Sequence, residues 1–229
     1  MVLENITDVF FDLDHTLWDF DKNSAVAFQT IFTNHQLLHV IDDFLMVYPQ
    51  INQKYWDLYR NDKITHRELR YYRLKESFTN IGIDISDEQI ENIANQYIDL
   101  LPNSNHLISG AISILDYLSK KYKLHIITNG LHEVQQRKLN NSKIKNYFKT
   151  ITDSDSVGIK KPNPQIFEFA LKKANVKPEN SVMIGDCIEA DVKGALQINM
   201  HAILLDETKK ITHPHIIIIN KLEELKKYL

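Results

Sequence analysis

Asp8-Val-Phe-Phe11 is a short apolar run followed at once by Asp12-Leu-Asp14-His-Thr16, and the fold of the chain can be worked out from this junction. The run is typical of a buried strand. In an open parallel sheet, ligands bind outside the carboxyl ends of the strands. Residues two apart in an extended segment face the same side. Asp12 and Asp14 are therefore expected at a ligand crevice, where two converging carboxylates need a cation or a shared proton.

Five more short apolar runs predict strands of the same kind, at Leu124–Thr128, Lys149–Thr152, Ser181–Ile184, Ala202–Leu205 and Ile216–Ile219. From residue 100 onward, the segments between them are long enough for the helices that join parallel strands. In residues 164–174 the apolar side chains recur with helical spacing, after Asn163 as a helix cap and Pro164 at the first helical position. This alternation predicts an α/β fold, in which a three-layer, Rossmann-like parallel sheet carries helices on both faces.

Residues 18–99 depart from this alternation, because helical patterns run through them without a convincing strand. One pattern has apolar residues spaced by four and three positions, namely Phe44, Tyr48, Ile51, Tyr55 and Leu58. Another begins at Ser86 and Gln89, which are spaced for a capping box. We therefore expect a core domain of residues 1–17 and 100–229, with an α-helical cap domain of residues 18–99 inserted after the first strand.

The composition excludes several classes of protein. The 229 residues include 27 Lys and Arg against 30 Asp and Glu, a formal net charge of −3, so bulk charge does not recruit nucleic acid or an anionic membrane. Cys187 is the single cysteine, which excludes an internal disulfide and a cysteine-based zinc site. We find neither a secretory signal nor an apolar run long enough to span a bilayer. A cytoplasmic protein that acts on a small molecule is expected.

Polar side chains also follow other predicted strands. Thr128-Asn129-Gly130 follows Ile126-Ile127, and Gly185-Asp186 follows Val182-Met183-Ile184. Between them lies Lys161-Pro162, where the proline restricts the backbone beside a lysine just before a helix. A hydroxyl, an amide, a fixed cation and several carboxylates at one sheet edge suit a magnesium ion together with a phosphate.

These motifs resemble, in order along the chain, the four motifs of the haloacid-dehalogenase-like (HAD) hydrolase superfamily. They are Asp12-Leu-Asp14-His-Thr16, Thr128-Asn129, Lys161-Pro162 and Gly185-Asp186-Cys-Ile-Glu-Ala-Asp191. Each motif alone is weak, but four in order are specific. Phe11–Phe20 and Ile127–Arg137 further resemble the bacterial pyrimidine 5′-nucleotidases of this superfamily, although His15 stands where many members have glycine.

The resemblance implies a Mg²⁺-dependent phosphomonoester hydrolase, and the residue types suit that chemistry. Asp12 would be the nucleophile that forms an aspartyl-phosphate, and Asp14 the acid and base for the leaving oxygen and the attacking water. Asp12, the backbone carbonyl of Asp14, and Asp186 would hold Mg²⁺. Thr128 and Asn129 would hold the phosphate oxygens. Lys161 would offset the negative charge of the nucleophile and the phosphate, and Asp191 would fix Lys161 or a metal-bound water.

The substrate is expected to be a nucleoside 5′-monophosphate with a pyrimidine base. The alternative substrates are phosphoglycolate and a sugar phosphate. The alternative functions are a phosphomutase reaction and that of a regulatory protein that binds phosphate without turnover. Trp18 is the candidate for stacking on a base, and its competing interpretation is packing between core and cap. His15 and Cys187 are expected to take no part in the chemistry. The motifs are compatible with a monomer or a homodimer.

Overall fold

The computed structural model describes residues 2–229. The chain divides into two compact units, one formed by Met1–Phe20 with Asn105–Leu229 and the other by Asp21–Ser104. We call the first the core unit and the second the helical unit. The divisions lie a few residues beyond the limits expected from the sequence, so that Trp18 belongs to the core unit.

Within residues 2–229, six strands form a single parallel sheet in the order β3-β2-β1-β4-β5-β6. The strands are β1 (Asp8–Phe11), β2 (Lys123–Thr128), β3 (Phe148–Asp153), β4 (Ser181–Gly185), β5 (His201–Leu205) and β6 (Ile217–Ile219). Each contains a run predicted from the sequence or overlaps it. In register, Phe11 of β1 lies between Ile126 of β2 and Ile184 of β4. The segments that follow these three strands therefore start at one edge of the sheet.

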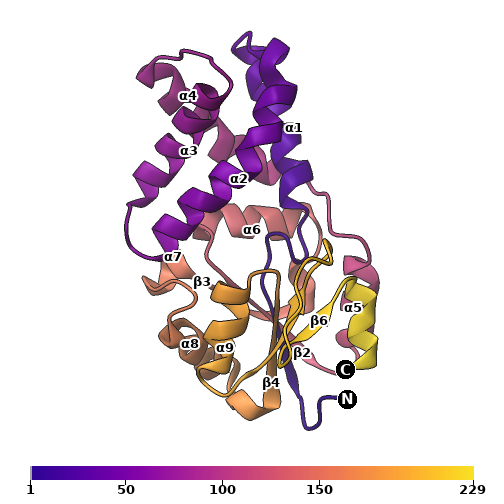
Figure 1. The fold of residues 1–229 in the computed structure, drawn as a ribbon. Coiled ribbons are helices and arrows are strands. Elements are labelled where there is room, and N and C mark those ends of the chain that lie inside the picture. The colour runs from indigo at the N-terminus through magenta and orange to yellow at the C-terminus, as the bar shows by residue number, and fades with distance from the viewer. Residues whose placement is uncertain (1) are drawn as a thin grey trace. The chain divides into compact units, whose positions relative to one another are not determined.

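Helices of the core unit cover both faces of this sheet (Figure 1). They are α5 (Ala111–Leu118), α6 (His132–Asn141), α7 (Ser154–Val157), α8 (Pro164–Ala174) and α9 (Gly194–Leu196), with 3-10 helices at Lys145–Tyr147, Pro178–Asn180 and Leu222–Lys227 and a π-helix at Ile188–Lys193. On one face α8 and α9 contact each other and the strands, while on the other α5 contacts the C-terminal 3-10 helix. The predicted three-layer α/β fold is confirmed.

The apolar core beneath α8 explains why these segments become helix and strand. Asn163 caps α8 by accepting a hydrogen bond from the backbone of Gln165 at 3.0 Å, and Pro164 occupies the first turn, as predicted. The helix then buries one stripe of side chains, including Ile166 and Phe167, against Phe10 of β1 and the strands beside it. These side chains are fully buried. Burial on both faces accounts for the nearly continuous apolar character of the central strands.

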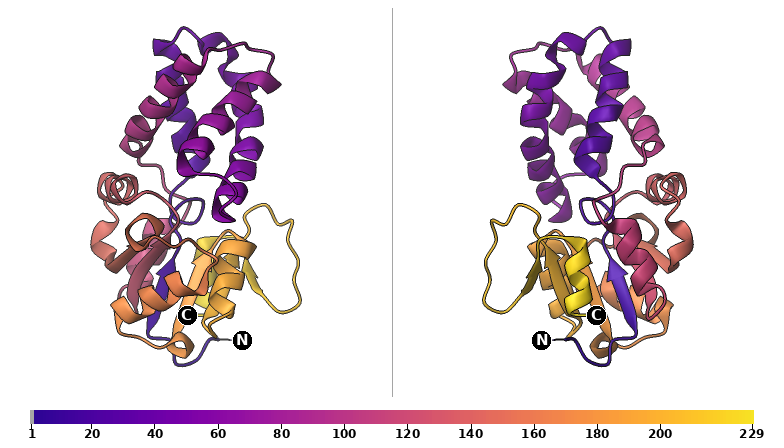
Figure 2. Two further views of the ribbon diagram at one scale, coloured as in Figure 1. Left: turned by 90° about the vertical axis from the view of Figure 1, so that its left-hand side faces the viewer. Right: turned by 90° about the vertical axis from the view of Figure 1, so that its right-hand side faces the viewer.

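The helical unit consists, in the described residues, of four α-helices and two short 3-10 helices. Figure 2 shows the ribbon from two sides. They are α1 (Phe20–Asn34), α2 (Ile41–Arg60), α3 (His66–Asn80) and α4 (Asp87–Leu100), with 3-10 helices at Leu38–Val40 and Leu101–Asn103. Its core is aromatic. Phe28 stacks on Tyr97 with ring centroids 4.5 Å apart, and Phe44 lies 4.8 Å from Phe28 and 5.0 Å from Phe78. These rings come from all four α-helices, so aromatic packing joins the helices of the unit.

The caps of the helical unit differ in one respect from the prediction. Ser86 accepts a hydrogen bond from the backbone of Gln89 at 3.3 Å, but the Gln89 side chain contacts the Ser86 hydroxyl instead of the Ser86 backbone. A complete capping box occurs instead at the start of α3, where Thr65 and Glu68 satisfy each other's backbone amides. The neutral amide of glutamine competes less well for a backbone N–H than the carboxylate of glutamate.

Candidate active site

The loop that follows β1 carries both aspartates of the first motif. The backbone N–H of Asp12 still donates to the carbonyl of Ile184 at 2.9 Å, so this residue continues the strand pairing. The chain then turns back, and the amide of Trp18 donates to the carbonyl of Leu13 at 2.8 Å. His15 adopts a positive φ of 60° within this turn. That left-handed conformation is one that glycine adopts most readily, and a histidine adopts it here.

Lys161 lies at the centre of the buried polar cluster. Its Nζ donates to Oδ1 of Asp12 at 2.6 Å, to Oδ1 of Asp191 at 2.7 Å and to the carbonyl of Ile127 at 2.7 Å. These three acceptors use all the hydrogens of an ammonium group. Asn129 holds the lysine backbone in place, because its side chain bonds both the N–H and the carbonyl of Lys161, at 2.7 and 2.9 Å. The loop therefore positions the cation beside Asp12.

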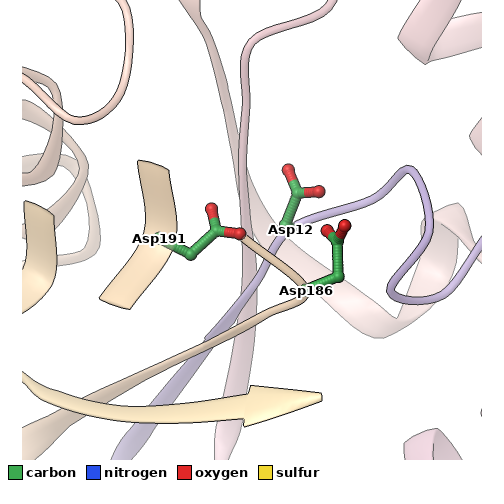
Figure 3. Close-up of side chains that lie close together, drawn as sticks. All are labelled: Asp12, Asp186 and Asp191. Carbon is green, nitrogen blue, oxygen red and sulfur yellow. The ribbon is translucent and has the colours of Figure 1, made fainter. Parts of the chain in front are cut away.

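Asp12, Asp186 and Asp191 form a cluster of carboxylates, which Figure 3 shows with their side chains gathered at the ends of β1 and β4. Each offers one oxygen, and these atoms lie within 4.8 Å of one another. Asp186 also accepts from the hydroxyl of Thr16 at 3.3 Å. With all three carboxylates ionised and Lys161 protonated, two negative charges remain, so the cluster matches the charge of a divalent cation.

The electrostatics of the cluster also favour the binding of a cation. Burial, together with the charges of Asp191 and Asp186, raises the pKa of Asp12 to about 8, although Lys161 acts in the opposite direction. Burial and the charge of Asp191 likewise raise the pKa of Asp186 to about 7. Burial by itself would lower the pKa of Lys161, but Asp12 and Asp191 raise it. Without a further cation, two carboxylates of the cluster are therefore reluctant to ionise.

Asp191 comes from the π-helix at Ile188–Lys193. Besides the contact with Lys161, its Oδ2 accepts from the backbone N–H of Cys187 at 3.1 Å. The Cys187 sulfur accepts from the backbone of Ala190 at 3.5 Å, so this thiol caps the start of the helix. Asp191 is 1% exposed. Both carboxylate oxygens of Asp191 therefore accept hydrogen bonds from protein groups, and one of these donors is Lys161.

The side chain of Asp14 lies outside the carboxylate cluster and is held by α6. Lys138 donates to Oδ1 of Asp14 at 2.6 Å, and Gln135 donates to Oδ2 at 3.0 Å. Gln135 also donates to the hydroxyl of Thr128 at 2.7 Å, and that hydroxyl accepts from the backbone N–H of Gly130 at 3.3 Å. The sequence interpretation missed Lys138 and Gln135. A lysine and a glutamine on a predicted helix otherwise indicate a solvated face.

The structure does not present Trp18 as a surface for a substrate base. Its side chain is fully buried, its indole N–H donates to the hydroxyl of Ser142 at 3.1 Å, and its ring lies 4.4 Å from Nζ of Lys138. Phe20 lies edge-on to it at 6.3 Å. The ring and the N–H of Trp18 both contact protein groups, which fits the competing interpretation of a packing residue better than stacking on a base.

The fold and this cluster define a hydrolase class that comparison with known proteins identifies. The family described as haloacid dehalogenase-like hydrolase matches residues 8–199, and the chain belongs to this family. A solved structure of the HAD-hydrolase YfnB from Bacillus subtilis bound to magnesium is similar to it, with a TM-score of 0.87, 26% identity and 97% of each chain covered. Among residues 2–229, none of the helices combines the length and apolar character needed to cross a membrane.

Curated relatives include enzymes with different phosphate substrates. YfnB is 28% identical over 95% of this chain and 92% of that protein. The pyrimidine 5′-nucleotidase YjjG of Escherichia coli is 29% identical over 84% of this chain and 82% of its own length. The glyceraldehyde 3-phosphate phosphatase of Methanothermobacter thermautotrophicus is 31% identical over 86% and 84%. The chain is thus similar to hydrolases named for a nucleotide and for a triose phosphate.

Proposed function

We propose that this protein is a Mg²⁺-dependent phosphomonoester hydrolase that acts through an aspartyl-phosphate on Asp12. One observation carries the proposal. Asp12 is held at 2.6 Å from Lys161 inside a carboxylate cluster, while Asp14 lies apart from that cluster with its own partners. The two aspartates of one motif therefore have different surroundings, as a nucleophile and an acid–base group require.

The reaction divides into two balanced steps. A carboxylate oxygen of Asp12 attacks the phosphorus, the bond to the leaving oxygen breaks, and that oxygen takes a proton from the Asp14 carboxyl group. In the second step a water attacks the phosphorus and gives a proton back to Asp14, which releases phosphate and the Asp12 carboxylate. Lys161 offsets the negative charge that gathers on Asp12 and the phosphoryl group, and Thr128 binds a phosphate oxygen.

The residues fit a magnesium ion. Asp12 and Asp186 supply the hard, anionic oxygens that Mg²⁺ prefers, and burial together with neighbouring carboxylates raises the pKa values of both. The backbone carbonyl of Asp14 is the further protein ligand that we propose. When bound, the ion would neutralise negative charge on the phosphate and so favour the approach of the Asp12 carboxylate.

A pyrimidine nucleoside 5′-monophosphate is the substrate that we propose, supported by the similarity to two pyrimidine 5′-nucleotidases along most of the chain. A second candidate is a small sugar phosphate, since the glyceraldehyde 3-phosphate phosphatases match to a similar extent. Carbon–halogen cleavage explains the residues less well, because a halide leaves without a proton and Asp14 and Asp186 would then have no task. We further propose that the helical unit is the cap that encloses the substrate and separates these alternatives.

The test is an assay of the purified protein with p-nitrophenyl phosphate and a panel of phosphorylated metabolites, each with Mg²⁺ and with excess EDTA. We expect activity only with the metal, and none in Asp12→Asn, which keeps the shape of the side chain but loses its charge. Asp116→Asn, at an exposed carboxylate of α5, should behave as the wild type. Full activity in EDTA or in Asp12→Asn would overturn the mechanism.

The same panel tests the substrate. Uridylate, thymidylate or cytidylate should be hydrolysed with a kcat/KM at least ~10-fold above that of phosphoglycolate and hexose phosphates, a transition-state difference of about 1.4 kcal/mol. A profile led by a triose phosphate would replace the nucleotide assignment with the second candidate and leave the phosphatase chemistry unchanged.

A further inference from the structure

Helix α6 places two polar side chains on the carboxylate of Asp14, one on each oxygen. Lys138 Nζ lies 2.6 Å from Oδ1, and Gln135 Nε2 lies 3.0 Å from Oδ2. Gln135 and Lys138 are three residues apart, so they project from the same side of the helix. A carboxylate that accepts a hydrogen bond at each oxygen cannot rotate about its χ2 angle without losing at least one of these bonds. The plane of the Asp14 carboxyl group is thereby fixed.

The Lys138 side chain is buried to an unusual degree for a lysine. It is 3% exposed, against 24% for the side chain of Asp14. Its ammonium lies 4.4 Å from the ring of Trp18 and 5.5 Å from the ring of Phe20, within the range of a cation–π contact. Burying this charge costs free energy that the carboxylate and the two rings must offset. Trp18 and Phe20 thus act on Asp14 indirectly, by holding the lysine that holds it.

Gln135 links Asp14 to the phosphate side of the site. Its Nε2 donates both to Asp14 and to the hydroxyl of Thr128, at 2.7 Å. Since a carboxylate only accepts hydrogen bonds, the amide must turn its NH₂ group toward Asp14. The Oε1 atom then remains buried without a hydrogen-bond partner. Gly130 makes room for this arrangement, because a Cβ at that position would overlap the Gln135 amide.

We propose that Lys138 and Gln135 are positioning residues that aim the Asp14 carboxyl group at the leaving oxygen of the substrate. Each carboxylate oxygen has two lone-pair directions, and α6 occupies one on each, so the directions that remain are fixed in space. This inference rests on the proposed function, in which Asp14 protonates the leaving oxygen. It adds Gln135 and Lys138 on α6 to the residues on which the acid–base step depends, although none of the four motifs contains them.

Substrates with different leaving groups should respond differently when Asp14 is misaligned. An alkoxide, such as the 5′-oxygen of a nucleoside, needs a proton as the bond to phosphorus breaks. A p-nitrophenolate is stable without one. Misaligning Asp14 should therefore slow hydrolysis of an alkyl phosphate much more than hydrolysis of p-nitrophenyl phosphate, because general acid catalysis contributes only where the leaving group needs it.

The test compares Lys138→Met, Lys138→Arg and Gln135→Met with the wild type on p-nitrophenyl phosphate and on the best alkyl phosphate of the metabolite panel. Lys172→Met, at an exposed lysine of α8, is the matched control. For Lys138→Met we expect kcat on the alkyl phosphate to fall by ~10²-fold and kcat on p-nitrophenyl phosphate by less than ~10-fold, with KM nearly unchanged. Lys138→Arg, which keeps the charge, should recover part of the loss.

A double variant keeps the result decisive. If Lys138 acts through Asp14, adding Lys138→Met to Asp14→Asn should not lower kcat on the alkyl phosphate any further. If the two residues had independent roles, the two losses in kcat would multiply. Equal losses on both substrates, or multiplicative losses in the double variant, would overturn the inference. If Lys138→Met does not fold by circular dichroism, Gln135→Met and Lys138→Arg carry the same comparison. A wild-type enzyme inactive on every phosphate would instead contradict the proposed function.

Discussion

Gly185 and Asp191 are in direct contact where β4 ends, since a Cβ on Gly185 would overlap the Asp191 carboxylate. Through this close approach Asp191 reaches Lys161 at 2.7 Å, and Lys161 in turn reaches Asp12 at 2.6 Å. The position of Lys161, the cation beside the proposed nucleophile Asp12, therefore depends on Gly185, which has no side chain. Glycine is required here because of space, since its φ lies outside the left-handed region.

Gly185→Ala should displace Asp191 and loosen Lys161. We expect the free energy of unfolding to fall by ~1–3 kcal/mol, as for other overpacked sites. Hydrolysis should slow by at least ~10-fold, since small displacements in a site can be costly. Denaturant titration and steady-state kinetics measure the two effects. A variant with normal stability and activity would show that the Asp191–Lys161 contact does not depend on this glycine.

The stability of the metal-free protein should depend on pH through Asp12 and Asp186. Their pKa values of about 8 and about 7 lie above the ordinary value of 3.8, so the folded state favours their protonated forms. The stability that they contribute is complete below about pH 4 and is lost as the pH rises through their folded-state values. With EDTA present, the melting temperature should therefore fall between about pH 5.5 and pH 8.

Mg²⁺ competes with these protons, so it should raise the melting temperature more at about pH 8 than at about pH 5.5. Differential scanning fluorimetry with and without the metal measures this difference. Asp186→Asn removes one of the titrating groups and should reduce the pH dependence of the shift. An equal Mg²⁺ effect at both pH values would contradict the assignment of the cluster as the metal site.

The aromatic core of the helical unit should dominate the stability of that unit. Phe44 on α2 is fully buried and lies 4.9 Å from Phe32 and 5.3 Å from Tyr48. Phe44→Ala should lower the free energy of unfolding by ~3–5 kcal/mol, from lost burial and the cavity left behind. Met46, on the same helix, is 78% exposed, and Met46→Ala should change the free energy by less than ~0.5 kcal/mol. Denaturant titration of the two variants makes the comparison, and similar effects would argue against this core.

The sequence determined the sheet and the residues at its carboxyl edge. Apolar runs bounded by polar residues are local signals, and parallel strands end at one edge wherever they stand in the order. Asp12, Thr128 and Asp186 could therefore be placed together without coordinates. The strand order was not predicted, and the structure supplies it. The two units divide a few residues beyond the expected limits, because helix boundaries carry a weaker local signal than strand cores.

Only the tertiary structure decided which side chains surround Asp14. Lys138 is 124 positions away in the chain, and a lysine on a helix has the same local pattern whether it faces solvent or a buried carboxylate. The burial of Trp18 was undecided for the same reason, since an aromatic residue after a catalytic loop can face a ligand or a neighbouring helix. Local patterns report which face of an element is apolar, whereas the partner of a buried polar group depends on how distant elements pack.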